Sequence, residues 1–141
     1  MAKRLRWRAL LLAGFILAPA LAADDEAQAQ RAPSVYVQRG IASWYGPGFH
    51  GRKTASGERF DQRRMTAAHR KLPLGTYATV VNLANGKSVR VEITDRGPYY
   101  GGRILDLSKA AATRLGMRDS GTTQIRLEVD EDDWAGRDGG A

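Results

Sequence analysis

Apolar and polar residues alternate in short runs along the second half of the chain, and turn residues separate the runs. In Ser88–Thr94, β-branched apolar residues occupy every second position, which predicts a strand with one buried and one solvent-facing side. Tyr77–Leu83 is a second β-rich run, and Asn85-Gly86 between the two runs is a strong hairpin signal. The two runs therefore predict an antiparallel hairpin.

Further short strands and one helix complete the predicted elements. Ser108–Leu115 has a good N-cap in Ser108, helix-forming residues after it, and Gly116 in the position of a C-terminal cap. The remaining strand-like runs are Gly40–Tyr45, Arg103–Leu107 and Thr123–Val129. Five or six short strands with one or two short helices in about 90 residues predict a small, closed, mainly β barrel.

The N-terminal segment has the layout of a secretory signal. Basic residues precede the apolar run Ala9–Leu17, and Ala20-Leu21-Ala22 fits the small-x-small cleavage pattern. The run is shorter than the roughly 20 apolar residues that span a membrane, so we expect residues 1–22 to be a cleaved signal peptide. The chain has no cysteine, hence no disulfide and no lipid attachment site. We expect a soluble exported protein, periplasmic or extracellular, without stable membrane insertion.

Composition divides the rest of the chain into three parts. Residues 23–39 predict a flexible linker, Gly40–Val129 the folded domain, and residues 130–141 a disordered acidic tail. The folded part holds 15 Lys/Arg against 7 Asp/Glu, a net charge of +8, which attracts anionic polymers. Export argues against nucleic acid as a partner and favours peptidoglycan, an anionic polymer with lactyl and peptide carboxylates.

Two polar, glycine-rich loops hold the candidate chemistry. Gly46–Arg64 contains Glu58 and Asp61, and Thr94–Tyr100 places Asp95 directly after a predicted strand. Glycan cleavage needs a carboxylic acid to protonate the glycosidic oxygen and a second group to stabilise or complete the oxocarbenium-like state. The two loops are expected to supply these carboxylates from opposite sides of a groove. Capping of turns is the structural alternative that the residues alone leave open.

Other polar and aromatic residues are less specific. A lone histidine such as His69, in an alanine-rich segment, is more typical of packing than of acid–base chemistry. The two histidines make no zinc pattern, and the sequence has no phosphate-binding glycine loop, so we expect no metal and no cofactor. Trp44 and Tyr45 can serve as core or as a sugar-stacking platform, and strand alternation predicts that one of the pair is buried.

A string of motifs covering nearly all of the folded part resembles the rare lipoprotein A domain. In chain order these motifs are Gly40–Gly46, Phe49–Asp61, Thr66–Thr76, Val81–Gly86, Thr94–Pro98 and Gly102–Ser108. The resemblance implies a six-stranded double-psi β-barrel, shared with expansins. It also implies action on peptidoglycan and, in active members, endolytic lytic transglycosylase chemistry on glycans stripped of stem peptides.

The resemblance also implies site residues. The implied catalytic residues are Asp95, Glu58, Asp61 and His69, with Asp95 first and Glu58 second for the acid/base role. The residues expected to bind substrate are Trp44, Tyr45, Lys53, Arg96 and Tyr99. A non-catalytic, expansin-like peptidoglycan-binding module is the main alternative function, and a small inhibitor or protein-binding barrel is the third.

Overall fold

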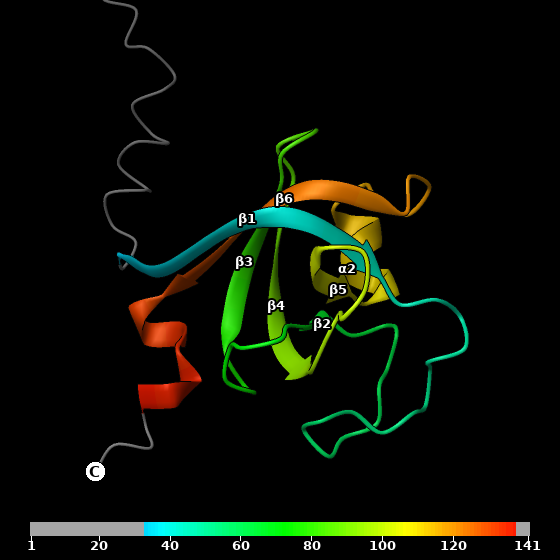
Figure 1. The fold of residues 1–141 in the computed structure, drawn as a ribbon, viewed down its shortest axis with the longest axis horizontal. Coiled ribbons are helices and arrows are strands. Elements are labelled where there is room, and N and C mark those ends of the chain that lie inside the picture. The colour runs from blue at the N-terminus through cyan, green and yellow to red at the C-terminus, as the bar shows by residue number, and fades with distance from the viewer. Residues whose placement is uncertain (1–32, 138–141) are drawn as a thin grey trace, which may run out of the picture. The chain divides into compact units, whose positions relative to one another are not determined.

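The computed structural model describes residues 33–137, and six strands within them form one closed barrel (Figure 1). The strands are β1 (Ser34–Trp44), β2 (Thr66–Ala68), β3 (Tyr77–Asn82), β4 (Ser88–Asp95), β5 (Arg103–Leu107) and β6 (Thr122–Asp130). Their order around the barrel is β1-β5-β2-β4-β3-β6. The helices are α2 (Lys109–Arg114) and the 3-10 turns η1 (Glu131–Asp133) and η2 (Ala135–Arg137).

The strand pairing combines local and crossed connections. β3 and β4 form the predicted antiparallel hairpin, and β6 pairs antiparallel with both β3 and β1. Two pairs are parallel, β1 with β5 and β2 with β4. Strands that cross in this way within a closed six-stranded barrel define a double-psi β-barrel, so the predicted fold class is confirmed.

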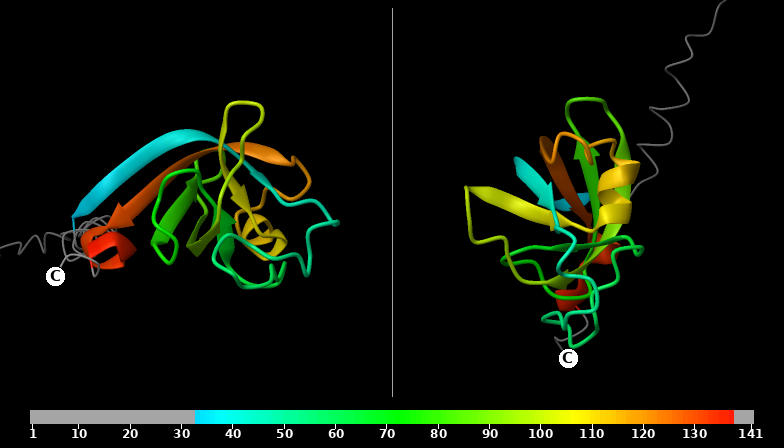
Figure 2. Two further views of the ribbon diagram at one scale, coloured as in Figure 1. Left: turned by 60° about the horizontal axis from the view of Figure 1, so that its bottom comes forward. Right: turned by 90° about the vertical axis from the view of Figure 1, so that its right-hand side faces the viewer.

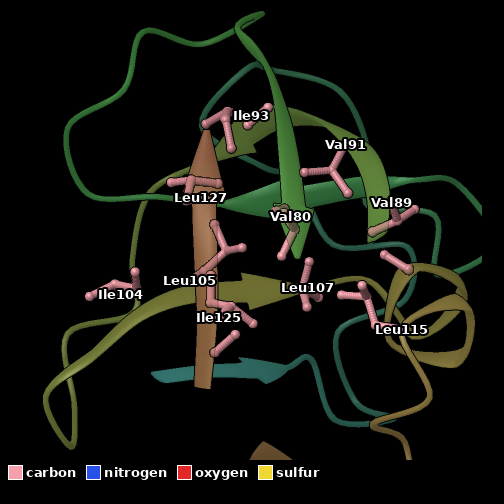
Figure 3. Close-up of a cluster of buried hydrophobic side chains, with 14 of the residues drawn as sticks. Val80, Val89, Val91, Ile93, Ile104, Leu105, Leu107, Leu115, Ile125 and Leu127 are labelled. Carbon is pink, nitrogen blue, oxygen red and sulfur yellow. The ribbon is translucent and has the colours of Figure 1, made fainter. Parts of the chain in front are cut away.

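Inward-facing aliphatic side chains fill the barrel (Figure 3). On β4 the alternation predicted from the sequence is present, with Val89, Val91 and Ile93 buried between more exposed neighbours. Leu105, Leu107, Ile125 and Leu127 of β5 and β6 are fully buried and meet them in the core. Each such side chain contributes about 1.5–3 kcal/mol through burial, and this core holds the fold together without any disulfide.

Helix α2 begins and ends where the sequence predicts. The hydroxyl of Ser108 accepts a hydrogen bond from the Ala111 amide at 3.2 Å, as an N-cap does. Gly116 follows the helix with φ +68°, a backbone conformation that favours glycine. The helix is short, and its buried face consists of Ala111 and Ala112.

The ends of the folded part differ from the sequence-based expectation. β1 begins at Ser34, inside the expected linker, and pairs with β6 as far as Asp130. After β6, the predicted tail forms η1 and η2, and Trp134 packs against Tyr36 with ring centroids 6.1 Å apart. Figure 1 shows these turns next to the start of β1. The acidic composition of the tail concealed this aromatic anchor.

Two further points concern the expected signal peptide and membrane-spanning helices. The expected signal peptide lies outside the described residues. Among residues 33–137, no helix is long and apolar enough to cross a membrane.

Candidate functional site

The barrel brings two aspartates to either side of one small residue. Ala68 of β2 pairs with Asp95 of β4 on one side and with Asp106 of β5 on the other. A register shift between Ala67 and Ala68 places Asp95 at this position, and such irregularities re-aim side chains next to functional sites. Because neighbouring strands lie about 4.8 Å apart, the two aspartate Cα atoms are about 10 Å apart.

Both aspartates line one open cleft with a volume of about 480 Å³. The long loop between β1 and β2 and the loop between β4 and β5 border it. In the left view of Figure 2, the loop between β4 and β5 projects at the top and the loop between β1 and β2 lies at the right and bottom. Its aromatic lining residues are Trp44, Tyr45, Phe49, Phe60, Tyr99 and Tyr100. Its charged lining residues are Arg52, Lys53, Arg96, Arg103, Asp95 and Asp106.

Three donors converge on the Asp95 carboxylate. Oδ2 accepts a hydrogen bond from the Tyr45 hydroxyl at 2.8 Å. Oδ1 accepts from the backbone amides of Ala55 and Arg96, each at 2.9 Å. The donors come from three parts of the chain, so the carboxylate is held in a fixed orientation at the edge of the cleft.

Tyr45 is locked in the position from which it donates to Asp95. Its ring packs against Phe60 and Phe49, with centroids 4.6 and 5.3 Å away. Burial, followed by the hydrogen bond to Asp95 and the nearby carboxylate charges, raises the pKa of the Tyr45 phenol. The phenol therefore keeps its proton and remains a donor to Asp95 at physiological pH.

Asp106 is held by a second network. The Ser43 hydroxyl of the paired strand β1 donates to Asp106 Oδ1, and Arg103 Nη1 donates to Ser43 Oγ at 2.8 Å. Arg103 Nη1 also lies 4.0 Å from Asp106 Oδ1. Ser43 is buried, whereas Asp106 is partly exposed, so its carboxylate is supported from within the barrel and open to the cleft.

A small hairpin closes the cleft on the side of Asp95. Backbone hydrogen bonds join Gly51 to Phe60 and Thr54 to Glu58 at 2.8 Å each. The buried Phe60 ring anchors this hairpin, and the Ser56 amide donates to the Thr94 carbonyl at the end of β4 at 3.1 Å. The hairpin is therefore fastened to the strand that carries Asp95.

The structure does not place Glu58 and Asp61 in this cleft. Both line a smaller hollow beside it, which shares Thr54 and Phe60 with the cleft. Each forms an ion pair with an arginine. Arg64 Nη1 lies 3.3 Å from Glu58 Oε2, and Arg63 Nε lies 3.1 Å from Asp61 Oδ1. The hydrogen bonds from Arg63 lower the pKa of Asp61.

His69 is also turned away from the cleft. Its side chain is 3% exposed, and Nδ1 accepts hydrogen bonds from the amides of Lys71 and Leu72 at 3.0 Å each. Nε2 lies 2.8 Å from Gln38 Oε1. Since Nδ1 accepts and the amide oxygen cannot donate, the ring is neutral with its proton on Nε2. Desolvation, followed by the charges of Arg70, Arg96 and Lys71, lowers its pKa to about 4.

The residues expected to bind substrate do line the cleft: Trp44, Tyr45, Lys53, Arg96 and Tyr99. The expectation that one of Trp44 and Tyr45 is buried is wrong, because both are half-buried and both face the cleft. β1 ends at Trp44, so strand alternation does not extend to Tyr45. Tyr99 and Tyr100 are 68% and 80% exposed, which leaves their rings free to stack.

Sequence reasoning missed Asp106. It lies between Leu105 and Leu107, in a strand interpreted only as core. The available signal was a charged residue flanked by two leucines in a short strand, since such a residue must face away from the core. Within residues 33–137, no group of three or more histidine, aspartate or glutamate side chains is placed to hold a metal ion.

The fold and the cleft define a double-psi β-barrel protein whose paired aspartates face a groove rich in aromatic rings and cations. Residues 37–127 match the family described as "Lytic transglycolase". This match covers more than half of the chain, and the chain belongs to that family.

Curated relatives carry a consistent name. A Synechocystis protein named "Probable endolytic peptidoglycan transglycosylase RlpA" is 58% identical over 93 residues, which cover 66% of this chain and 29% of the relative. "Endolytic peptidoglycan transglycosylase RlpA" of Neisseria meningitidis is 54% identical over 93 residues, covering 66% and 39%. The Pseudomonas aeruginosa protein of that name is 52% identical over 100 residues, covering 70% and 29%. The chain thus spans about a third of the length of these relatives.

Solved structures share the barrel. An expansin of Clavibacter michiganensis superposes with a TM-score of 0.54 at 25% identity, covering 68% of this chain and 52% of that one. A Streptomyces papain inhibitor gives a TM-score of 0.54 at 22% identity, covering 69% and 96%. The second likeness concerns the fold alone.

Proposed function

We propose that this chain is a peptidoglycan lytic transglycosylase that cleaves glycan strands endolytically in the cell envelope and prefers strands without stem peptides. The observation that carries the proposal is the pair Asp95 and Asp106, on either side of Ala68, facing one aromatic-lined cleft. The family match and the names of the relatives support the same reaction.

In the proposed reaction, the two aspartates divide the work. One carboxyl group donates its proton to the glycosidic oxygen as the bond to the anomeric carbon breaks. The substrate's own 6-hydroxyl then attacks the anomeric carbon, and the same carboxylate takes the hydroxyl proton. A 1,6-anhydro end forms without any water, and the catalytic carboxyl regains its proton.

Hydrogen bonding favours Asp106 as the proton carrier. Three donors hold Asp95 in a fixed position, from which a carboxylate would stabilise the positive charge of the transition state. On Asp106, Ser43 and Arg103 both lie at Oδ1, and Oδ2 accepts no hydrogen bond from the described residues, so Oδ2 is the atom open to the glycosidic oxygen. On this ground we propose Asp106 for the acid/base role, with Asp95 as the alternative.

The test is incubation of residues 33–141 with glycan strands stripped of stem peptides, followed by mass analysis. Wild type should release anhydro sugars, lighter by one water than hydrolysis products. Asp106→Asn and Asp95→Asn should each lower kcat at least about 100-fold and retain glycan binding, because the amide keeps the shape of the side chain. Asp119→Asn, an exposed aspartate outside the cleft, is the matched control and should retain full activity.

The same panel separates the alternatives. Glu58→Gln and Asp61→Asn should affect activity less than the two cleft variants, and the reverse order would place the reaction at the smaller hollow. Products that carry an added water would identify a hydrolase. Binding without any product would support the expansin-like module, the second candidate, which the likeness to the Clavibacter expansin favours.

A further inference from the structure

Cations outnumber carboxylates in the cleft. Arg52, Lys53, Arg96 and Arg103 line it together with only two aspartates. Two positive charges in excess inside a groove concentrate anionic ligands there. Such a field favours a glycan that carries negative charge over a neutral one.

Three of these four cations already have partners. Arg96 Nη1 donates to the carbonyls of His69 and Leu72 at 3.3 and 2.7 Å. Arg103 donates to the Tyr100 carbonyl and to Ser43. The Arg52 guanidinium lies over the Phe49 ring, 5.4 Å from its centroid.

Lys53 is the exception. Within residues 33–137, its ammonium group has no hydrogen-bond, ion-pair or ring partner, and its side chain is exposed. Its backbone is nevertheless fixed, because Lys53 pairs with Arg59 in the hairpin that closes the cleft. Two residues further on, Ala55 donates its amide to Asp95. The backbone of Lys53 is therefore held close to one of the two aspartates, and its ammonium group is left unpaired at the cleft.

The proposed substrate offers a matching group. Every second sugar of a peptidoglycan strand is a muramic acid, which bears a lactyl ether on O3. Removal of the stem peptide leaves the lactyl group as a free carboxylate. Chitin-like glycans have the same backbone linkage without this charge.

We propose that Lys53 binds the lactyl carboxylate of a muramic acid residue in the cleft and so makes the site selective for muramic glycans over neutral ones. This inference rests on the proposed function, since it names the group of the proposed substrate that the cleft recognises. A single charge-assisted contact at a partly exposed site is expected to change affinity about five- to tenfold. The change should appear mainly in Kd and KM, because the contact is made equally in the ground state and the transition state.

The experiment compares two glycans. One is glycan stripped of stem peptides, and the other is the same glycan after chemical reduction of its lactyl carboxylates to alcohols. Wild type should bind the first about five- to tenfold more tightly. Lys53→Met should lose most of this preference by binding the native glycan more weakly, whereas Lys53→Arg should retain it.

Lys87→Met is the matched control. Lys87 precedes Ser88, at the end of β4 opposite to Asp95, about 25 Å away along an eight-residue strand. This variant removes the same charge and should leave the preference unchanged. Equal binding of both glycans by wild type, or an unchanged preference in Lys53→Met, would overturn the inference.

Binding is measured separately from cleavage, with fragments too short to be cut. If the protein releases no anhydro sugar and still shows the Lys53-dependent preference, the proposed reaction fails while the inference about recognition stands. If cleavage occurs without that preference, the inference alone fails.

Discussion

At the scale of single residues, the buried His69 side chain holds the loop that follows β2. Its neutral ring accepts the amides of Lys71 and Leu72 and contacts Gln38, and its own backbone amide donates to the Asp95 carbonyl. The side chain thus fixes the loop after β2, whose carbonyls Arg96 binds. It orients the end of β4 without touching the cleft.

A pH dependence of stability follows from this arrangement. The folded-state pKa of His69 is lowered to about 4, against an ordinary value near 6.5. Between these values the unfolded chain binds a proton that the folded protein does not, so the free energy of unfolding falls as pH decreases from about 6.5 to 4. Urea unfolding of wild type across this range should show the loss.

His69→Asn is expected to flatten this dependence. An asparagine oxygen can still accept a loop amide but does not titrate in this range. His50→Asn is the matched control, because His50 is an exposed loop residue. The free energy of unfolding of this variant should fall between pH 6.5 and 4 as that of wild type does. Parallel curves for wild type and His69→Asn would show that other groups cause the acid sensitivity.

Residues in the cleft were predictable to different degrees. Asp95 was found because it follows an alternating strand and precedes Gly97-Pro98, a turn signal. Asp106 was not, because only the pairing of β2 with both β4 and β5 reveals that it lies across from Asp95. That pairing joins segments distant in sequence, and local patterns carry no information about it.

At the scale of elements, short-range signals were sufficient for most of the barrel. The β3–β4 hairpin and α2 were predicted from alternation, turn residues and caps, and the structure confirms them. The strand β2 was missed because it has three residues, all buried, and hence no alternation to detect. It pairs along both edges, with β4 and with β5.

The end of α2 provides a test of cap geometry. Gly116 has φ +68°, and a Cβ at this position would lie 3.0 Å from Asn85 Nδ2, the group that donates to the Leu115 carbonyl. Gly116→Ala should therefore lower the free energy of unfolding by about 2 kcal/mol, from backbone strain plus crowding. Urea denaturation measures this loss.

Gly86→Ala is the comparison that separates the two causes. Gly86 has φ +76°, and no atom lies within 4 Å of the Cβ position. Only backbone strain applies there, so the expected loss is about 1 kcal/mol. Equal losses in both variants would show that the contact with Asn85 has no energetic effect.

At the scale of the whole molecule, the segment after β6 fastens the open end of the β1–β6 ribbon. Trp134 packs on the core beside Tyr36, and the Ala135 amide donates to Thr76 Oγ1 at 3.3 Å. Arg90 and Asp133 form an ion pair at 2.6 Å. Composition predicted disorder for residues 130–141. The segment is instead folded as far as Arg137, because Trp134 packs against the core.

Trp134→Ala should lower the free energy of unfolding by about 2–3 kcal/mol, because it removes a large, partly buried ring. Asp133→Asn should lower it by less than about 1 kcal/mol, since the ion pair it removes is partly exposed. Thermal unfolding of both variants compares the two contributions. A larger loss for Asp133→Asn would mean that charge, and not packing, holds this segment.

The closure of the barrel has a consequence for how the chain folds. β1 starts at Ser34, yet its partners β5 and β6 start at Arg103 and Thr122. A high contact order of this kind slows folding, because the first strand must wait for the last. On a nascent chain, β1 and β3 keep unpaired edges until β6 has been synthesised, and exposed edges of this kind pair with other chains. Closure of the barrel by its last strand thus makes the unfinished barrel prone to aggregation.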